Sequence, residues 1–341
     1  MKALVYAAPE KVEIRDVPPP APREGAVKVR MRYCGICGSD IGIFAGKHPR
    51  AKAPLILGHE FVGVVDEIGA GTRGRFKKGD RVVAYPLLSC GECLPCRTGT
   101  PHVCKSLRLI GIDVDGGIAE HAWIDEDVLF KVPEGLTDRV AALIEPLAVI
   151  VRSMHQARFK LLDSVVITGA GPIGVLTALV AKHSGASRVV ISDIDEARLG
   201  LCRELGFEAV NVRQEAVVDY VARTTGGDGM DVVFECSGAE SAALDMTRLC
   251  RIGGMICMTG VHKAPHAVDL RELNFKEQTI VGTRVYTKRE FEMAVGYAAQ
   301  LSAELEKVVT QVVPLSNSEG IFAMIADPAV NTVKVLVDCE N

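Results

Sequence analysis

Four of the eleven cysteines lie within the fifteen-residue stretch CGECLPCRTGTPHVC. They are Cys90, Cys93, Cys96 and Cys104. Disulfides, a redox switch, a nucleic-acid-binding zinc module and a structural metal clip are all compatible with such a cluster. Four thiolates complete the tetrahedral shell of a zinc ion and leave no open position for a substrate. The stretch by itself leaves these alternatives open, and a structural metal clip would place the chemistry elsewhere in the chain.

A second set of metal-ligating residue types is scattered through the first half of the chain. Cys37 lies in CGSD (37–40), His59 and Glu60 lie in GHE, and Glu145 lies in LIEPLAV. A catalytic zinc needs about three protein ligands and one open position, which thiolate, imidazole and carboxylate groups supply. The ordinary alternatives are a core cysteine, a satisfied histidine and a surface acid. An acid in so apolar a run as LIEPLAV nevertheless needs pairing or a metal, because burying a free carboxylate is costly.

The stretch VVITGAGPIG places Gly169, Gly171 and Gly174 in the pattern G-x-G-x-x-G, with Pro172 and Ile173 between the last two. The three glycines permit a tight turn, a close approach of the backbone to a pyrophosphate and close packing of helix on strand. A helix opening at Pro172 directs its free amides at the phosphates. The pattern predicts a dinucleotide-binding site.

The next apolar strand ends at Asp193, nineteen residues after Gly174. A carboxylate there accepts hydrogen bonds from the adenosine ribose and repels a 2′-phosphate, so NAD is expected rather than NADP. Asp195 competes for this role but lies beyond the end of the strand. Arg198 either stacks on the adenine or is a solvated helix residue.

Two kinds of element must position these residues. Residues 1–135 alternate short apolar runs with Gly, Pro and Asp, which predicts a small β-rich domain. Within them Val27, Val29, Met31 and Tyr33 alternate with Lys28, Arg30 and Arg32, which predicts a strand with one half-buried face. From Val165 onward, six apolar strands alternate with amphipathic helices that start near residues 172, 196, 215 and 240, which predicts a doubly wound parallel sheet. The strands are expected at 165–168, 188–193, 208–212, 230–236, 255–260 and 279–283, with C′ glycines at 185, 206 and 226 after three of the helices.

The last part of the chain predicts a helix at 289–301, a strand at 307–313, a short helix at 319–327 and a final strand at 332–338. These elements are too few for a domain of their own, and we expect them to pack on the N-terminal domain. The predicted fold is α/β, with a β-rich catalytic domain formed by residues 1–147 and 284–341 and a Rossmann cofactor domain formed by residues 148–283.

Composition narrows the class of protein. The formal net charge is −4, so the chain as a whole does not match a polyanion, and no nucleic acid is expected as a partner. No run approaches the roughly 18 apolar residues of a membrane span. The N-terminal stretch resembles a first strand rather than a signal peptide. We therefore expect a cytoplasmic protein, in which clustered cysteines more often bind metal.

These motifs together resemble the zinc-dependent medium-chain alcohol dehydrogenases, in particular the branch of polyol and L-threonine dehydrogenases. The resemblance spans the whole chain and includes CGSD, GHEFVGVV, the four-cysteine lobe, LIEPLAV, GAGPIG and TGV (259–261). It implies a GroES-like catalytic domain and two zinc ions per subunit, one catalytic and one structural. It also implies NAD(H) as cofactor and a homodimer or homotetramer.

The resemblance further implies site roles. The catalytic zinc ligands would be Cys37, His59 and Glu60 or water, with Glu145 either ligating zinc or holding its water. Ser39 would take the alcohol proton. The nicotinamide would be lined by Thr259, Gly260, Val261 and Arg284. The family pattern is broken at Gly42, where many relatives have a histidine that ends the proton relay, and at Ile43 and Phe44, where an aromatic hydroxyl often follows.

The expected activity is oxidation of a secondary alcohol, such as a polyol or sugar acid, to a ketone. An L-threonine 3-dehydrogenase-like enzyme and a dehydrogenase of short anionic diols are alternatives within the same chemistry. A zinc-free quinone reductase is disfavoured by the ligand set. A nucleic-acid-binding protein would need a far more basic lobe than one with Arg97 and Lys105.

Overall fold

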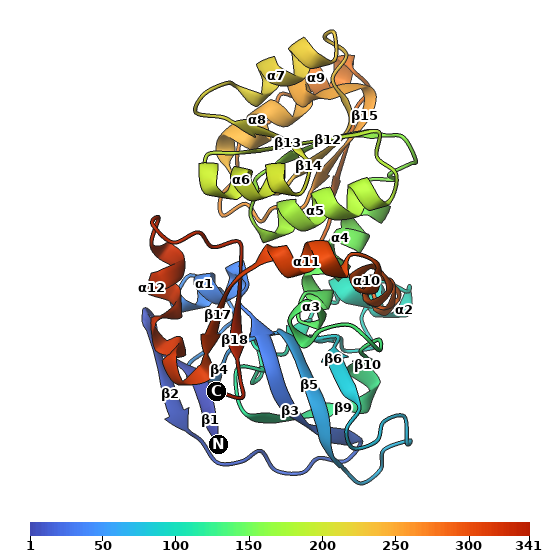
Figure 1. Cartoon of the computed structure of the whole chain (residues 1–341). Helices are drawn as coiled ribbons and strands as arrows, with labels where there is room; N and C mark the ends of the chain where they lie inside the picture. The colour runs from blue at the N-terminus through green and yellow to red at the C-terminus, as the bar shows by residue number, and fades with distance from the viewer. The chain divides into compact units, whose positions relative to one another are not determined.

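The computed structural model describes residues 1–341, which form two compact units (Figure 1). Unit 1 contains Met1–Ala148 and Thr287–Asn341, and unit 2 contains Val149–Tyr286. The domain boundaries predicted from sequence, 147/148 and 283/284, lie one and three residues before these unit boundaries. The division into a catalytic and a cofactor domain at those residues remains a prediction. No helix is both long enough and apolar enough to span a lipid bilayer.

Unit 1 is built on a seven-stranded sheet and a three-stranded sheet. In the larger sheet the order is β10-β6-β5-β3-β18-β17, with β9 also paired to β3, and in the smaller it is β2-β1-β4. The strands are β1 (Lys2–Ala8), β2 (Lys11–Asp16), β3 (Ala26–Gly35), β4 (Leu55–Ile56), β5 (Glu60–Ile68), β6 (Arg81–Ala84), β9 (His121–Asp125), β10 (Leu129–Lys131), β17 (Val309–Pro314) and β18 (Lys334–Asp338), with a separate pair β7 (Leu87–Leu88) and β8 (Arg108–Leu109).

The central strand β3 shows why this sheet forms. Val27, Val29 and Met31 are fully buried, whereas Lys28 and Arg30 between them are only partly buried. Successive side chains on a strand point to opposite faces, so this alternation puts one face of β3 into the core. The alternation predicted from sequence is confirmed for Val27, Val29 and Met31, whereas Tyr33 is only partly buried.

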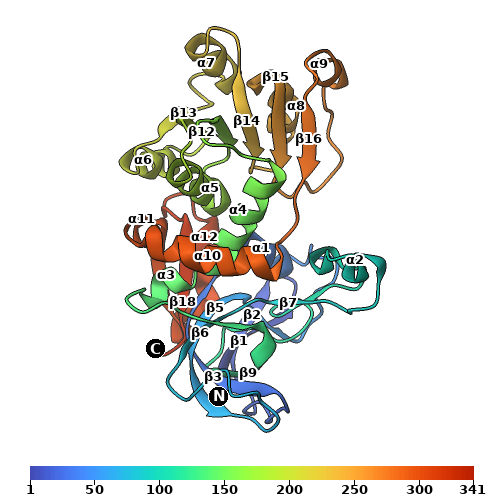
Figure 2. The same ribbon diagram turned by 90° about the vertical axis from the view of Figure 1, so that its right-hand side faces the viewer.

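The helices of unit 1 range from four residues in α2 and α3 to thirteen in α10 (Figure 2). They are α1 (Gly38–Phe44), α2 (Leu94–Arg97), α3 (Asp138–Ala141), α10 (Lys288–Gln300), α11 (Ser302–Val308) and α12 (Ile321–Ala326), with 3-10 turns η1 (Pro101–Val103), η2 (Glu126–Val128) and η3 (Leu315–Gly320). The helix α4 (Ile144–Gln156) begins in unit 1 and continues into unit 2.

The C-terminal segment returns to the first sheet, because β18 pairs with β3 in antiparallel register. The strand predicted at 307–313 begins too early. Leu301, Leu305 and Val308 are all buried at helical spacing, and this stripe extends α11 to Val308 before β17 starts at Val309.

Unit 2 is a six-stranded parallel sheet with the order β13-β12-β11-β14-β15-β16. Numbered within the unit this is 3-2-1-4-5-6, the order of a Rossmann fold, so the predicted fold class is confirmed. Its strands are β11 (Ser164–Thr168), β12 (Arg188–Asp193), β13 (Glu208–Asn211), β14 (Met230–Glu235), β15 (Cys250–Met258) and β16 (Thr279–Gly282), and its helices are α5 (Pro172–His183), α6 (Glu196–Glu204), α7 (Val217–Thr224), α8 (Glu240–Leu249) and α9 (Leu270–Phe275), besides most of α4.

Three of these helices end as the sequence predicts. Gly185, Gly206 and Gly226 follow α5, α6 and α7 with φ of 91°, 82° and 65°, which a C′ glycine adopts without strain. Other details differ: α7 starts at Val217 rather than near Glu215, β15 starts at Cys250 rather than residue 255, and α9 was not expected. The core contains apolar residues of β11, β12, β14, α7 and α8 packed together.

Candidate active site: two metal-ligand clusters and a dinucleotide fold

The ligand residues Cys37, His59 and Glu60 meet at the end of β3 and the start of β5. Their sulfur, imidazole nitrogen and carboxylate oxygen all lie within 4.8 Å of one another. Cys37 is the N-cap residue of α1, and its backbone amide donates to Asp40 Oδ2 at 2.8 Å. Asp40 is fully buried. The carboxylate therefore fixes the turn that carries Cys37.

Gly58 allows the chain to place His59. Its φ is +98°, and a Cβ there would lie 2.5 Å from Cys34 Sγ and 2.6 Å from Ile118 Cγ1. Both the left-handed backbone and the close packing exclude a side chain at this position. The tight turn leads directly into β5, which begins at Glu60.

The imidazole of His59 has polar neighbours on both ring nitrogens. Asp40 Oδ1 is 3.9 Å from Nδ1, and Ser39 Oγ is 3.5 Å from Nε2. Burial alone would lower the pKa of His59, but Asp40, Cys37 and Glu145 outweigh it and raise the pKa well above its usual value. The surroundings thus favour positive charge next to this ring.

Glu60 is paired with a lysine that the sequence analysis missed. Lys334 and Glu60 are 1% and 2% exposed, and Lys334 Nζ forms an ion pair with Glu60 Oε2. The ammonium also donates to the carbonyl of Ile36 at 2.9 Å. Burial tends to lower the pKa of Lys334, yet Glu60 and Cys37 raise it overall. Gly35 has no side chain to obstruct this pair.

Glu145 stands apart from the three-residue cluster. It lies in the first turn of α4, is 7% exposed, and its charge acts on both His59 and Lys334. The structure does not bring its carboxylate within the 4.8 Å set formed by Cys37, His59 and Glu60.

This donor set fits a zinc ion. Thiolate, imidazole and carboxylate are the ligand types of catalytic zinc sites. Three buried carboxyl groups, those of Asp40, Glu60 and Glu145, act electrostatically on a single buried ammonium, that of Lys334, so a divalent cation would offset part of the negative charge at this site. A histidine ligand usually turns its second ring nitrogen to a carboxylate, and the Asp40 carboxylate lies on that side of the ring, 3.9 Å from His59 Nδ1 and beyond hydrogen-bond distance.

The other predicted residues near Cys37 have distinct environments. Ile43 is 1% exposed and therefore belongs to the core, and Phe44 stacks on Phe322 with ring centroids 4.6 Å apart. A Cβ on Gly42 would contact nothing within 4 Å, so the position of the missing relay histidine is open space.

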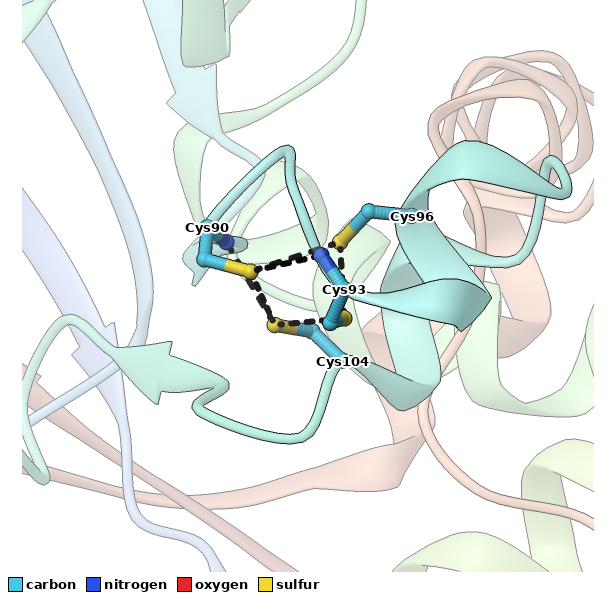
Figure 3. Close-up of side chains that lie close together, drawn as sticks. All are labelled: Cys90, Cys93, Cys96 and Cys104. Atoms are coloured by element: carbon cyan, nitrogen blue, oxygen red, sulfur yellow. Dashed lines mark hydrogen bonds between the residues drawn. The ribbon is translucent and has the colours of Figure 1, made fainter.

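The four-cysteine lobe brings its sulfurs together (Figure 3). The Sγ–Sγ distances are 3.4 Å for Cys93–Cys96 and for Cys90–Cys104, 3.7 Å for Cys93–Cys104, and 3.9 Å for Cys90–Cys96. A regular tetrahedron of Zn–S bonds of about 2.3 Å has edges of about 3.8 Å. A disulfide would require about 2.05 Å, and all eleven cysteines are free. The lobe therefore has the geometry of a closed zinc site.

The cofactor motif forms the expected turn in unit 2. Gly169 follows β11 with φ +96°, and α5 starts at Pro172 with Gly171 as its N-cap. A Cβ on Gly174 would overlap the carbonyl oxygen of Gly169, so this glycine is required for the helix to approach the strand. Ile173 lies in the first turn of α5.

Asp193 ends β12 beside this turn. Its Oδ2 accepts from the amide of Ala170 at 2.6 Å. Asp195 instead caps α6 by accepting from the amides of Ala197 and Arg198. Arg198 Nη1 would lie 4.0 Å from a Cβ on Gly171, so the guanidinium lies near the start of α5. Asp193 Oδ1 accepts from the amides of Ile194 and Asp195 at 2.7 and 2.9 Å, so Asp193 holds the fingerprint turn at the end of β12 whereas Asp195 serves α6.

The residues expected around the nicotinamide follow the next strands. Thr259 and Gly260 donate their amides to the carbonyl of Glu235 at 2.8 and 2.7 Å. Val261 is 85% exposed, and Arg284 is exposed two residues after β16. Sequence reasoning assigned no role to Glu235, although an acid in the apolar run VVFEC carries the same signal as Glu145 does in LIEPLAV.

Comparison with known proteins assigns the class. Residues 23–134 match the family model of the alcohol dehydrogenase GroES-like domain, and residues 172–300 match that of the zinc-binding dehydrogenases. A 2-dehydro-3-deoxy-L-galactonate 5-dehydrogenase from Pseudoalteromonas atlantica is 37% identical over 94% of this chain and 93% of its own. An L-threonine 3-dehydrogenase from Pseudoalteromonas translucida is 34% identical over 95% and 96%.

Comparison with solved structures also assigns the chain to the zinc-binding dehydrogenases. A protein assigned to the zinc-binding dehydrogenases, from Sinorhizobium meliloti and bound to NADP, superposes with a TM-score of 0.92 at 30% identity over 99% of this chain and 98% of its own. The chain belongs to the zinc-binding alcohol dehydrogenase family. It is an oxidoreductase that acts on the CH–OH group of a small secondary alcohol with a nicotinamide dinucleotide, and these findings support that class rather than the nucleic-acid-binding alternative.

Proposed function

We propose that this chain is a zinc-dependent, NAD-linked dehydrogenase that oxidises one secondary hydroxyl of a sugar acid or polyol to a ketone. The observation that carries the proposal is the convergence of Cys37, His59 and Glu60 on one point in unit 1, in a chain whose unit 2 carries the dinucleotide fingerprint. The sugar-acid relative, 37% identical, supports that substrate class.

When bound, zinc would polarise the substrate hydroxyl as a Lewis acid, and NAD would accept the hydride. Cys37 and His59 would hold the metal, with Glu60 or Glu145 as the carboxylate ligand. Asp40 would hold His59 in orientation. Ser39, whose Oγ is 3.5 Å from His59 Nε2, would accept the hydroxyl proton of the substrate. Because Gly42 provides no histidine, that proton would pass to another group or to solvent.

The cofactor preference rests on Asp193. Its carboxylate lies at the end of β12 and would repel a 2′-phosphate, which supports NAD. The adenosine half would contact Gly169, Gly171, Pro172, Ile173, Gly174, Asp193 and Arg198, and the nicotinamide half Thr259, Gly260, Val261 and Arg284. The Sinorhizobium structure contains NADP, so the ratio of kcat/KM with NAD to kcat/KM with NADP is the test of this preference.

The four-cysteine lobe would hold a second, structural zinc, which gives two zinc ions per chain. A cytoplasmic location is part of the proposal and is supported by the eleven free thiols, because a reducing compartment keeps such cysteines unpaired. We also propose a homo-oligomer, a dimer or tetramer.

The test combines metal content with a substrate panel. NADH formation at 340 nm is followed with NAD and sugar acids, polyols, L-threonine and short diols, each scored by kcat/KM. We expect the highest value for a sugar acid or polyol, and loss of turnover when both metals are removed by a chelator. Full activity after verified removal of both metals would refute the zinc mechanism, and a much higher value for L-threonine would favour the alternative substrate.

A further inference from the structure

Glu235, the last residue of β14, is a fully buried acid to which the proposed reaction gives no role. Its Oε1 accepts from the amides of Ser237 and Gly238 at 2.8 and 2.9 Å and from the Ser237 hydroxyl at 2.6 Å. Its backbone carbonyl accepts from the amides of Thr259 and Gly260. One residue therefore holds both the loop that follows β14 and the loop that follows β15.

A histidine on the second loop completes this network. His262 Nε2 lies 2.9 Å from Glu235 Oε2, and the imidazole is only 18% exposed. A Cβ on Gly260 would lie 2.6 Å from Oε2, so a glycine is needed between Thr259 and His262 for the loop to pass this carboxylate. The pair fixes the chain on both sides of Val261.

The network lies where a doubly wound sheet binds its ligand. The strand order reverses between β11 and β14, and dinucleotides bind in the crevice outside the carboxyl ends of the strands at such a point. Glu235 is the carboxyl end of β14. Gly169, the first fingerprint glycine at the carboxyl end of β11, is closely packed against Ser237, with a Cβ there 3.1 Å from its backbone.

We propose that Glu235 and His262 are a positioning pair that fixes the loop of residues 259–262 for the nicotinamide half of the cofactor. A loop ordered before binding loses less conformational freedom when the ligand arrives, which increases affinity. The adenosine half would rely on Asp193 and Arg198, which belong to β12 and α6. The inference rests on the proposed function only in taking NAD(H) as the cofactor.

The discriminating experiment compares two ligands on the full-length, zinc-loaded protein. NADH carries the nicotinamide, whereas ADP-ribose lacks it, and both dissociation constants are measured by NADH fluorescence and its displacement. We expect His262→Ala to raise the Kd of NADH about tenfold, because a charge-assisted hydrogen bond is lost, and that of ADP-ribose less than about twofold. His262→Gln keeps a donor for the carboxylate and should restore most of the affinity.

His266→Ala is the matched control. His266 lies on the same loop, and its ring packs edge-on against that of His262 with the two ring centroids 5.3 Å apart. It does not contact Glu235, so the Kd of NADH and the Kd of ADP-ribose should both stay unchanged. If His262→Ala does not fold, Glu235→Gln, which keeps the shape and removes the charge, is measured instead and should show the same selective loss.

Equal weakening of NADH and ADP-ribose would overturn the inference, since it would indicate a general disturbance of unit 2. Unchanged NADH affinity in both His262→Ala and Glu235→Gln would overturn it as well. A wild-type protein that bound neither ligand would instead refute the proposed cofactor itself. The two failures are therefore distinguishable.

Discussion

The buried ion pair between Lys334 and Glu60 gives the most direct test of how the metal centre is built. Replacing Lys334 by Met keeps most of the length of the side chain and removes the ammonium, which leaves the Glu60 carboxylate buried without its partner. Breaking a buried pair in this way costs about 3–5 kcal/mol. Because both side chains are at most 2% exposed, solvent screens the attraction between their charges very little. We expect the metal-free Lys334→Met protein to be about 3 kcal/mol or more less stable than wild type.

The size of the loss should depend on zinc. A divalent cation bound by Cys37 and His59 would supply the positive charge that Glu60 has lost. The penalty of Lys334→Met should therefore be smaller in the zinc-loaded protein than in the metal-free protein, because the metal takes over part of the role of Lys334. Unfolding by urea, with and without zinc, measures both quantities.

Two further variants serve as controls for the stability of Lys334→Met. Lys263→Met removes an exposed lysine for which the structure shows no ion pair, and its free energy of unfolding should stay within about 0.5 kcal/mol of wild type. The double variant Lys334→Met with Glu60→Gln removes both charges and should be more stable than Lys334→Met alone. A loss below about 1 kcal/mol in the metal-free single variant, or an equal loss with and without zinc, would refute this reasoning.

The remaining predictions address the two metal sites, the cofactor and acid stability. Cys37→Ser should lose one zinc and all turnover in a folded protein, whereas Cys90→Ser should lose one zinc and thermal stability; metal analysis with 340 nm assays would contradict this if Cys37→Ser stayed active. Asp193→Ser should raise kcat/KM for NADP relative to NAD at least about tenfold, and an unchanged ratio would remove the ribose role. The hydrogen bond from Arg188 lowers the pKa of Glu208, so its stabilisation is present above the ordinary carboxyl pKa of 4.5 and is lost as pH falls below it. Glu208→Gln should thus be less stable than wild type by up to about 1 kcal/mol at pH 7, with the gap closing as pH falls through the lowered pKa of Glu208 in urea titrations, and a gap independent of pH would argue against it.

Local patterns were sufficient to predict much of the fold. The alternation in β3, the fingerprint at Gly169–Gly174 and the C′ glycines each depend on residues close in sequence, so backbone geometry and burial follow from local spacing. The strand predicted at 307–313 was misplaced because apolar residues of a short helix and of a strand resemble each other when the pattern is brief. The helix α9 was missed for a similar reason, since it has only six residues and none of them is buried.

The sequence by itself determined which functional groups this protein has: four clustered thiols, a scattered Cys–His–Glu set and a dinucleotide turn. Only the tertiary structure decided which of these groups meet. Cys37 caps α1 just after β3 ends, whereas Glu60 starts β5. Lys334 lies far along the chain and reaches Glu60 because β18 pairs with β3. Burying the ammonium of a lysine in the apolar run VKVLV costs free energy unless a partner is buried with it. That partner is a long-range contact, and no local spacing encodes it.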